Sequence, residues 1–173
     1  MRAVFVRDAR WQALLDPEAG LWRSIPAEVI ALAGAPSALQ PTAAVRAAFP
    51  EGSIGAIKSV SLAAAHNGSD IAFRLQWEDA SADTGADGQD DTGFPDAAAV
   101  LFPTRATAPL MSMGAPGLPV NAWYWRADEP GRGRHVSAEG LGTTETVDRD
   151  LVRVKGQHRD GAWHVVIARA LRA

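Results

Sequence analysis

The chain has 173 residues, enough for one domain with one core, and 47% hydrophobic and 21% charged residues are ordinary values for a globular protein. A net charge of −3 argues against nucleic-acid binding. The absence of cysteine excludes disulfides, thiolate metal sites, Fe–S ligation and cysteine nucleophiles. Sixteen glycines and eleven prolines predict many short elements joined by turns. No apolar run reaches the roughly 20 residues that a membrane-spanning helix needs.

The N-terminal part predicts a single short helix, from Asp8 to Leu15. Asp16-Pro17 is expected to end it, because the residue before a proline disfavours helical geometry. The Pro- and Ala-rich stretch that continues to Pro50 is interpreted as a connection along the surface.

The first hairpin is predicted over Ser59–Trp77, where apolar residues recur at every second position on both sides of Asn67-Gly68. Residues 78–93 are strongly acidic, which is compatible with a calcium loop. Their spacing does not follow the EF-hand pattern, and a solvated acidic loop is the favoured interpretation.

The second half of the chain predicts further short strands. They are expected at Ala97–Phe102, Val120–Arg126 and Val136–Thr144, followed by a hairpin over Leu151–Leu171 that turns at Asp160-Gly161. Short strands with turn signals about every ten residues are typical of sandwiches and barrels. The sequence therefore predicts one all-β domain over 1–173, an antiparallel β-sandwich with a few short helices in its connections.

The chemistry of the residues leaves several functions open. The four histidines do not pair at metal-ligand spacing, and neither a Gly-x-Ser-x-Gly elbow nor a phosphate-binding glycine loop is present, so catalysis by this chain has little support. Six tryptophans could form core, a sugar-stacking platform or the walls of a cofactor pocket. Core is the expectation for Trp77 and Trp163. Trp123 and Trp125 share one strand face with Asn121 and fit a pocket wall equally well.

The loop before this strand carries two thioethers, Met111 and Met113. Methionine is a soft ligand for iron and also a common filler of gaps in a core. From the residues alone, the second role is the more common one.

Several runs in the second half, taken in order, resemble a known family. These are Phe94–Pro103, Met113-Gly114, Pro119–Asp128 and the closing run from Val154 to Arg169. Together they resemble the haem-binding (gamma) subunit of the type II dimethyl sulfoxide reductase family, found in ethylbenzene dehydrogenase, dimethylsulfide dehydrogenase, selenate reductase and chlorate reductase. A weaker likeness extends over Ser59–Asp79.

The resemblance implies a β-sandwich that holds one haem through a methionine and a lysine. Met113, which precedes Gly114, is the implied methionine, with Met111 a close competitor, and Lys155 is the implied lysine. Because the chain has no cysteine, the haem would be non-covalent, of b type. Asn121, Trp123 and Trp125 are predicted to line its pocket. With both axial positions filled, such a haem relays electrons and binds no substrate.

The resemblance also implies partners. Molybdenum and Fe–S cofactors need ligands that this chain lacks, so a heterotrimer with a molybdenum subunit and an Fe–S subunit is expected, together with a soluble electron carrier. The family implies a periplasmic location, whereas the short, charged N-terminus does not resemble a signal peptide and leaves the cytoplasm as the alternative. The alternative function is a carbohydrate-binding β-sandwich without haem.

Overall fold

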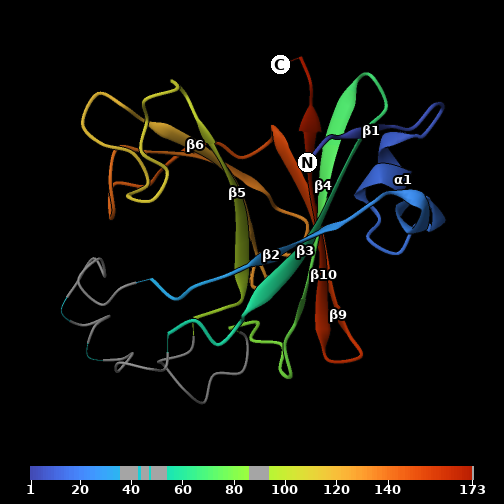
Figure 1. Cartoon of the computed structure of the whole chain (residues 1–173), viewed down its shortest axis with the longest axis horizontal. Coiled ribbons are helices and arrows are strands. Elements are labelled where there is room, and N and C mark those ends of the chain that lie inside the picture. Colours follow the sequence, from blue (N-terminus) through green and yellow to red (C-terminus); the bar gives the residue numbers. More distant parts are fainter. Residues whose placement is uncertain (36–42, 44–46, 48–53, 86–93, 173) are drawn as a thin grey trace.

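The computed structural model describes residues 1–35, 43, 47, 54–85 and 94–172, and it folds these into two β-sheets that pack face to face (Figure 1). The first sheet, sheet A, contains six strands: β1 (Val4–Phe5), β2 (Glu28–Ala31), β3 (Ser59–His66), β4 (Asp70–Glu78), β9 (Val152–Arg159) and β10 (Ala162–Ala170). The second, sheet B, contains four: β5 (Ala97–Pro103), β6 (Val120–Arg126), β7 (Arg134–Ala138) and β8 (Glu145–Asp148). The predicted antiparallel β-sandwich is confirmed.

Two tight turns fix the registers of sheet A. In the turn between β3 and β4, the side-chain Oδ1 of Asn67 accepts hydrogen bonds from the backbone N–H groups of Ser69 (2.9 Å) and Asp70 (2.7 Å). Between β9 and β10, Asp160 and Gly161 both have positive φ angles, of 54° and 72°. Positive φ at both central residues is what a two-residue hairpin turn of type I′ requires. Both predicted hairpins are therefore present.

The core lies between the sheets and is rich in aromatic side chains. Sheet A contributes Phe73, Trp77 and Trp163, and sheet B contributes Trp123 and Trp125. The indoles of Trp125 and Trp163 meet edge to face, with ring centroids 4.8 Å apart, a favourable geometry for aromatic pairs. These contacts hold the two sheets in a fixed relation, which matters for any site on the outside of either sheet.

The outer face of sheet A is covered by the N-terminal segment. Helix α1 (Trp11–Leu15) and the 3₁₀ helix η1 (Gly20–Ser24) lie against it, on the right of Figure 1. Leu14 is fully buried, and Trp22 is 5% exposed. They pack on small residues of the sheet, including Ala65 and Ala72. The middle of sheet A is thus covered on both sides, whereas β2 at its edge is exposed.

The structure differs from the sequence expectations in three elements. The N-terminal helix starts at Trp11 rather than Asp8, which has a positive φ of 61°. Of the strand predicted over Val136–Thr144, only Val136 to Ala138 are in a strand, the end of β7. The rest connects β7 to β8, which begins at Glu145, and Gly140 and Gly142 in this connection take positive φ angles. Strands β1 and β2, which flank β3, had no signal. The stretch up to Pro50, interpreted as a connection, contains η1 and β2 in its first part. Residues 36–42, 44–46 and 48–50 of that stretch, and residues 86–93 of the acidic loop, lie outside the described residues.

Candidate functional site

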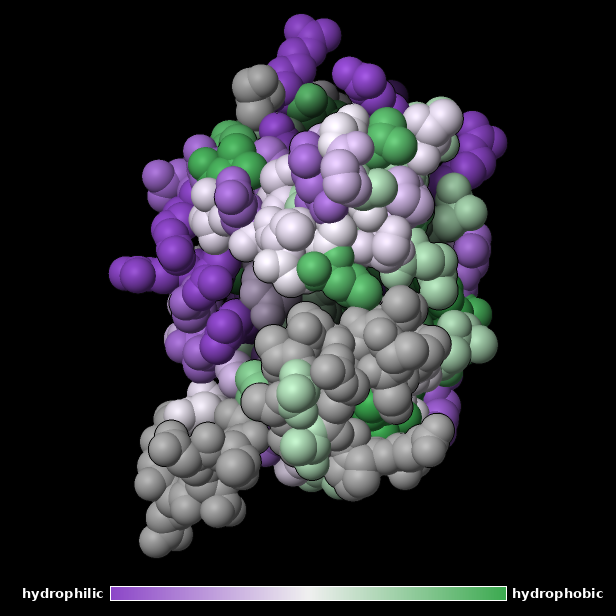
Figure 2. Space-filling model, turned by 90° about the vertical axis from the view of Figure 1, so that its left-hand side faces the viewer, coloured by the Kyte–Doolittle hydropathy of each residue, from purple (hydrophilic) through white to green (hydrophobic). Residues whose placement is uncertain are grey.

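A cavity of about 390 Å³ lies on the outer face of sheet B, the face turned away from the core. It is lined by Ala99, Leu101, Met113, Ala122, Tyr124, Arg126, Arg134, Val136, Thr144 and Thr146. Figure 2 looks onto this side of the molecule, where weakly polar and apolar residues occupy the middle and strongly polar residues gather along one flank. A volume at the lower end of the usual range of ligand pockets means that a large flat ligand would be only partly enclosed.

Strand alternation creates the floor of this cavity. Ala122 of β6 lies between Leu101 of β5 and Val136 of β7 in the antiparallel register, so that their side chains share the outer face. Ala99 is in the same row as Tyr124. The short alanine side chains leave the hollow that larger residues would fill.

The loop between β5 and β6 brings Met113 to the edge of the cavity. Met113 has a positive φ of 55°, and its backbone is tied on both sides: its N–H donates to Leu110 O (3.0 Å), and its C=O accepts from Gly140 N (2.9 Å). Gly114 follows with a φ of +92°, and a Cβ there would lie 2.5 Å from Ala138 O. Only glycine fits so close an approach. The Met113-Gly114 pair therefore fixes the thioether against sheet B.

The two methionines of this loop have different environments. Met113 is partly buried against Leu101, Val120 and Ala138. Met111 is 86% exposed and does not line the cavity. Of the two candidates, Met113 is the one whose side chain faces a space that a ligand could occupy.

Two arginines, each paired with a carboxylate, form the opposite, polar end of the cavity. Arg126 donates to both carboxylate oxygens of Asp128, at 2.8 and 2.7 Å, and Arg134 binds both oxygens of Glu129. These hydrogen bonds lower the pKa of Asp128 and of Glu129 below their ordinary values, and the Asp128 contact raises the pKa of Arg126. Tyr124 stands between the arginines, and burial raises the pKa of its phenol, so the hydroxyl stays protonated.

The predicted pocket residues of β6 point the other way, into the sandwich. Trp123 and Trp125 are 8% and 2% exposed and belong to the aromatic core. Asn121 has the same strand parity. The side-chain oxygen of Asn121, the indole nitrogen of Trp123 and Nδ1 of His135 are buried with no hydrogen-bond partner among the described residues. Asn121, Trp123 and Trp125 do not line the cavity beside Met113. That these three residues contact a cofactor stays a prediction.

The tryptophans do not form a platform for sugars. Trp22, Trp77, Trp123, Trp125 and Trp163 are all buried, and Trp11 is 40% exposed. Arg153 already covers the Trp11 ring, with its guanidinium carbon 4.7 Å from the ring centroid. The feature on which the carbohydrate-binding alternative rests is therefore absent from the described surface.

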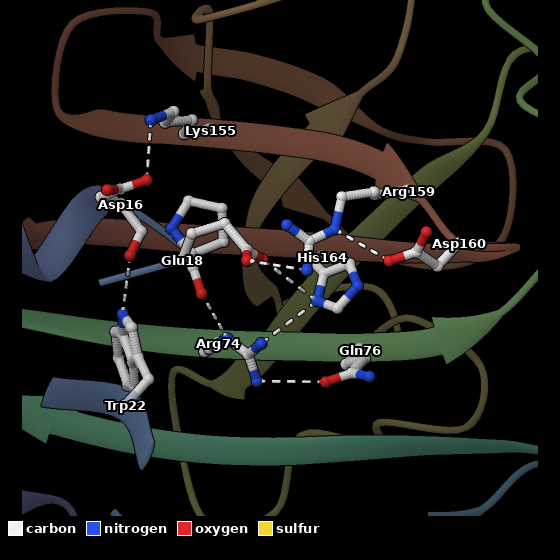
Figure 3. A network of polar contacts seen from close by, with 10 residues as sticks. Asp16, Glu18, Trp22, Arg74, Gln76, Lys155, Arg159, Asp160 and His164 are labelled. Atoms are coloured by element: carbon white, nitrogen blue, oxygen red, sulfur yellow. Dashed lines mark hydrogen bonds and ion pairs between the residues drawn. The ribbon is translucent and has the colours of Figure 1, made fainter. Parts of the chain in front are cut away.

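Lys155 lies on the opposite side of the molecule, on the outer face of sheet A. Its Nζ donates to Asp16 Oδ1 at 2.8 Å, which joins β9 to the end of α1 (Figure 3). The hydrogen bond from Lys155 lowers the pKa of Asp16. Nearby, Arg74 Nη2 donates to His164 Nδ1 at 3.1 Å, and Glu18 Oε1 lies 3.6 Å from the same nitrogen. This is a network of satisfied polar groups beneath the N-terminal segment.

Met113 and Lys155 are thus not brought together. Two axial ligands must approach one iron from opposite faces of a flat ring, whereas these side chains lie on different sheets, separated by the core. Met113, the apolar floor and the polar end fit one side of a haem. Lys155 does not fit the same haem in this arrangement, and its predicted role as a ligand stays a prediction.

No group of three or more His, Cys, Asp or Glu side chains able to hold a metal ion is present in the described part of the chain. His158 is bound to Asp79 O (2.8 Å), His164 to Arg74, and His66 packs on the ring of Phe5. Within the same residues, the structure has no helix with the length and hydropathy to cross a membrane.

Sequence reasoning missed most of the cavity floor. The alternation of the Val120–Arg126 strand separates Ala122 and Tyr124 from the tryptophans, but the tryptophans carry the stronger signal. Small and aliphatic residues such as Ala99 and Val136 resemble ordinary core. The combination of an outward-facing small-residue row with a neighbouring Met-Gly turn is the signal that could have found them.

The described residues form a β-sandwich in which the N-terminal segment covers much of one sheet, while the outer face of the other sheet holds a cavity with Met113 at its edge. The chain matches the family described as ethylbenzene dehydrogenase over residues 19–151. It is 36% identical over 157 residues to a Haloferax mediterranei protein named as a respiratory nitrate reductase heme subunit, covering 90% of this chain and 52% of that protein. It is 32% identical over 163 residues to the chlorate reductase subunit gamma of Ideonella dechloratans, covering 91% and 61%.

The chain belongs to the ethylbenzene dehydrogenase family. It spans between one half and two thirds of the length of these two relatives. The resemblance inferred from the Phe94–Pro103 and Pro119–Asp128 runs is confirmed.

Proposed function

We propose that this chain binds one haem and transfers electrons as a subunit of an oxidoreductase complex. One relative is named a heme subunit and the other a gamma subunit of a reductase, which supports the assignment. The observation that carries it here is the position of Met113, a thioether held by a glycine-dependent turn at the edge of an apolar cavity. The chain has no cysteine for thioether attachment, so the haem is proposed to be of b type.

In this proposal the haem lies against the outer face of sheet B. The bound group supplies a one-electron redox centre. Met113 would supply a thioether ligand, Ala99, Leu101, Ala122 and Val136 would cover the group with apolar surface that excludes water, and Arg126 and Arg134 would form the polar end of the site. Because the cavity encloses only part of such a ring, one edge remains near the surface, as exchange of electrons with a partner requires.

The proposal includes partners. A molybdenum cofactor subunit and an Fe–S subunit would form a heterotrimer with this chain, because this chain offers no cysteine ligands for either centre. A soluble electron carrier would complete the relay, and the periplasm is the proposed compartment. The chain itself is proposed to be non-catalytic.

The test is reconstitution of the full chain with haemin. We expect a 1:1 complex with a sharp Soret band, a pyridine haemochrome of b type, and pigment that acid–acetone extracts. Met113→Ala should change the spectrum and lower the reduction potential, because a thioether favours ferrous iron. Met111→Ala is the matched control, since Met111 is exposed in the same loop.

Three results would contradict the proposal. They are failure of the folded wild-type protein to bind haemin, haem that resists extraction, and a Met111→Ala variant that alters the spectrum while Met113→Ala leaves it unchanged. For the complex, purification from the source organism should yield co-eluting molybdenum and iron–sulfur. A lone monomer would contradict the partner assignment.

A further inference from the structure

The cavity on sheet B has two chemically different ends, and this asymmetry carries a further step that rests on the proposed function. At one end lie Leu101 and Met113, and at the other Arg126 and Arg134 flank Tyr124. We propose that Arg126 and Arg134 bind the two propionate carboxylates of the haem. The propionate edge of the ring then points toward the turn between β6 and β7, and the apolar edge lies beside Met113.

The backbone places both guanidinium groups on the correct side of the sheet. Tyr124 pairs directly with Arg134 across β6 and β7, and Arg126 lies two residues after Tyr124. In a strand, residues two apart share a face, and directly opposed residues have adjacent side chains. The two arginines therefore leave the sheet on the same face as Ala122 and Val136, which form the floor.

Both guanidinium groups are already presented to carboxylates in the required geometry. Arg126 donates hydrogen bonds to Asp128, and Arg134 to Glu129, each through Nε and Nη2. This two-pronged contact is the preferred geometry between arginine and a carboxylate. The pairs occupy the Nε and Nη2 side of each guanidinium and hold it in place at the end of the cavity, and Asp128 and Glu129 are themselves 29% and 26% exposed.

Hydrogen-bonding capacity remains for the propionates. A guanidinium has five N–H donors, and the contacts to Asp128 and Glu129 use the Nε and one Nη2 donor of each arginine. The phenol of Tyr124, kept protonated by burial, makes no hydrogen bond within the described residues and adds a third donor between the two arginines. The site can thus bind two carboxylates without losing its own ion pairs.

The test compares two ligands on a matched set of variants. The full chain, its Arg134→Gln and Arg126→Gln variants, and the control Arg132→Gln are each reconstituted with haemin and with haemin dimethyl ester, whose propionates carry no charge. Arg132 is exposed, lies in the same turn and does not line the cavity. The readouts are the rate of haem transfer to apomyoglobin and the reduction potential.

We expect each of Arg134→Gln and Arg126→Gln to speed haem loss by roughly tenfold or more, the value of a charge-assisted hydrogen bond. Each should also lower the reduction potential, because a positive charge near the ring favours the reduced iron. Arg132→Gln should behave as wild type. With the dimethyl ester, the wild type should lose affinity and the two variants should no longer differ from it.

The outcomes separate this inference from the proposed function. If the wild type binds haemin and its dimethyl ester equally well, and the arginine variants match the control, the propionate assignment is wrong and the haem assignment stands. If the folded wild type binds neither ligand, the proposed function itself fails. Should a variant not fold by circular dichroism, the comparison of the two ligands on the wild type still decides the question.

Discussion

The two outer faces of the sandwich are built from the same alternating strands but have opposite characters. The outer face of sheet A is partly covered by α1 and η1, and its charged groups are paired: Lys155 with Asp16, and Arg74 with Pro17 O, Gln76 and His164. Both faces carry small residues, but on sheet A the N-terminal segment packs on them, whereas on sheet B they line a cavity. A satisfied face stabilises the fold, whereas an open face with an apolar hollow and a fixed thioether is available to a ligand.

The largest expected effect is a loss of unfolding free energy when the packing on the covered face of sheet A is disrupted. Trp22→Ala removes a side chain that is 5% exposed and whose indole N–H donates to Asp16 O at 3.0 Å. Truncating a buried tryptophan costs about 3–5 kcal/mol of unfolding free energy. Urea unfolding measures this, and Trp11→Ala, at a 40% exposed position on the same segment, is the control with a much smaller loss. At temperatures where Trp22→Ala is folded, the haem spectrum should be unchanged. A changed spectrum would mean that the faces are coupled.

A second experiment changes glycines in the loop between β5 and β6, which holds Met113 at the outer face of sheet B. Gly114→Ala places a Cβ 2.5 Å from Ala138 O at a φ of +92°, and Gly117→Ala has a φ of +73° with open space around it. Both substitutions introduce strain from the positive φ, which costs about 1–3 kcal/mol of stability. Only Gly114→Ala must also displace the loop that holds Met113. We expect Gly114→Ala to lose haem and Gly117→Ala to retain it in reconstitution titrations. Equal haem loss in both would show that the close approach does not position the methionine.

The role of Lys155 gives a smaller but sharper contrast. Its pair with Asp16 is exposed at 43% and 39%, so Lys155→Arg and Asp16→Asn should each change stability by about 0–1 kcal/mol. Because Lys155 lies on the outer face of sheet A, away from the cavity on sheet B, we expect both variants to keep the haem spectrum of the wild type. Arginine cannot deprotonate to ligate iron. A changed low-spin spectrum in Lys155→Arg alone would restore Lys155 as an axial ligand and require the faces to rearrange around the haem.

The smallest expected effect is the pH dependence of stability that His164 causes on the covered face of sheet A. Burial lowers the pKa of His164, whose Nδ1 accepts a hydrogen bond from Arg74. The unfolded chain then binds a proton more readily than the folded one, so stability is full above about pH 6.5 and falls as the pH is lowered through the folded pKa. Thermal melts between pH 7.5 and 5 should show this slope, and His164→Gln should flatten it. An unchanged slope would assign the acid sensitivity to another group, such as His135.

Sequence patterns predicted the sheets well because their signals are local. The hairpins around Asn67-Gly68 and Asp160-Gly161 depend on turn residues and alternation that can be read from a few neighbouring positions. Strands β1 and β2 could not be predicted, because they are short and exist only through pairing with β3. The strand predicted over Val136–Thr144 ran on through the connection between β7 and β8 because glycines in a loop resemble glycines in a bulged strand.

The site was less predictable than the fold, for a physical reason. Met113 was implied by the family resemblance, but the direction of the side chains of β6 relative to the core depends on which face of β6 packs against sheet A. Trp123 and Trp125 suggested a pocket on the face of β6 that carries them, whereas in the structure both belong to the core between the sheets. Lys155 was likewise implied by the resemblance, yet its neighbour Asp16 comes from a segment 139 residues away, a contact that no local pattern contains.

Strand β3 also constrains the order in which the chain can fold. It pairs with three strands: with β4 through a local turn, and with β1 and β2 from the beginning of the chain, where Val4 meets Ala65 and Glu28 meets Leu62. Local hairpins close faster than contacts between distant segments, because a longer loop must be closed for the latter. The β3–β4 hairpin therefore serves as the template, and the N-terminal segment docks onto it afterwards. In pulsed hydrogen exchange during refolding, the amides of β4 should gain protection before those of β1 and β2.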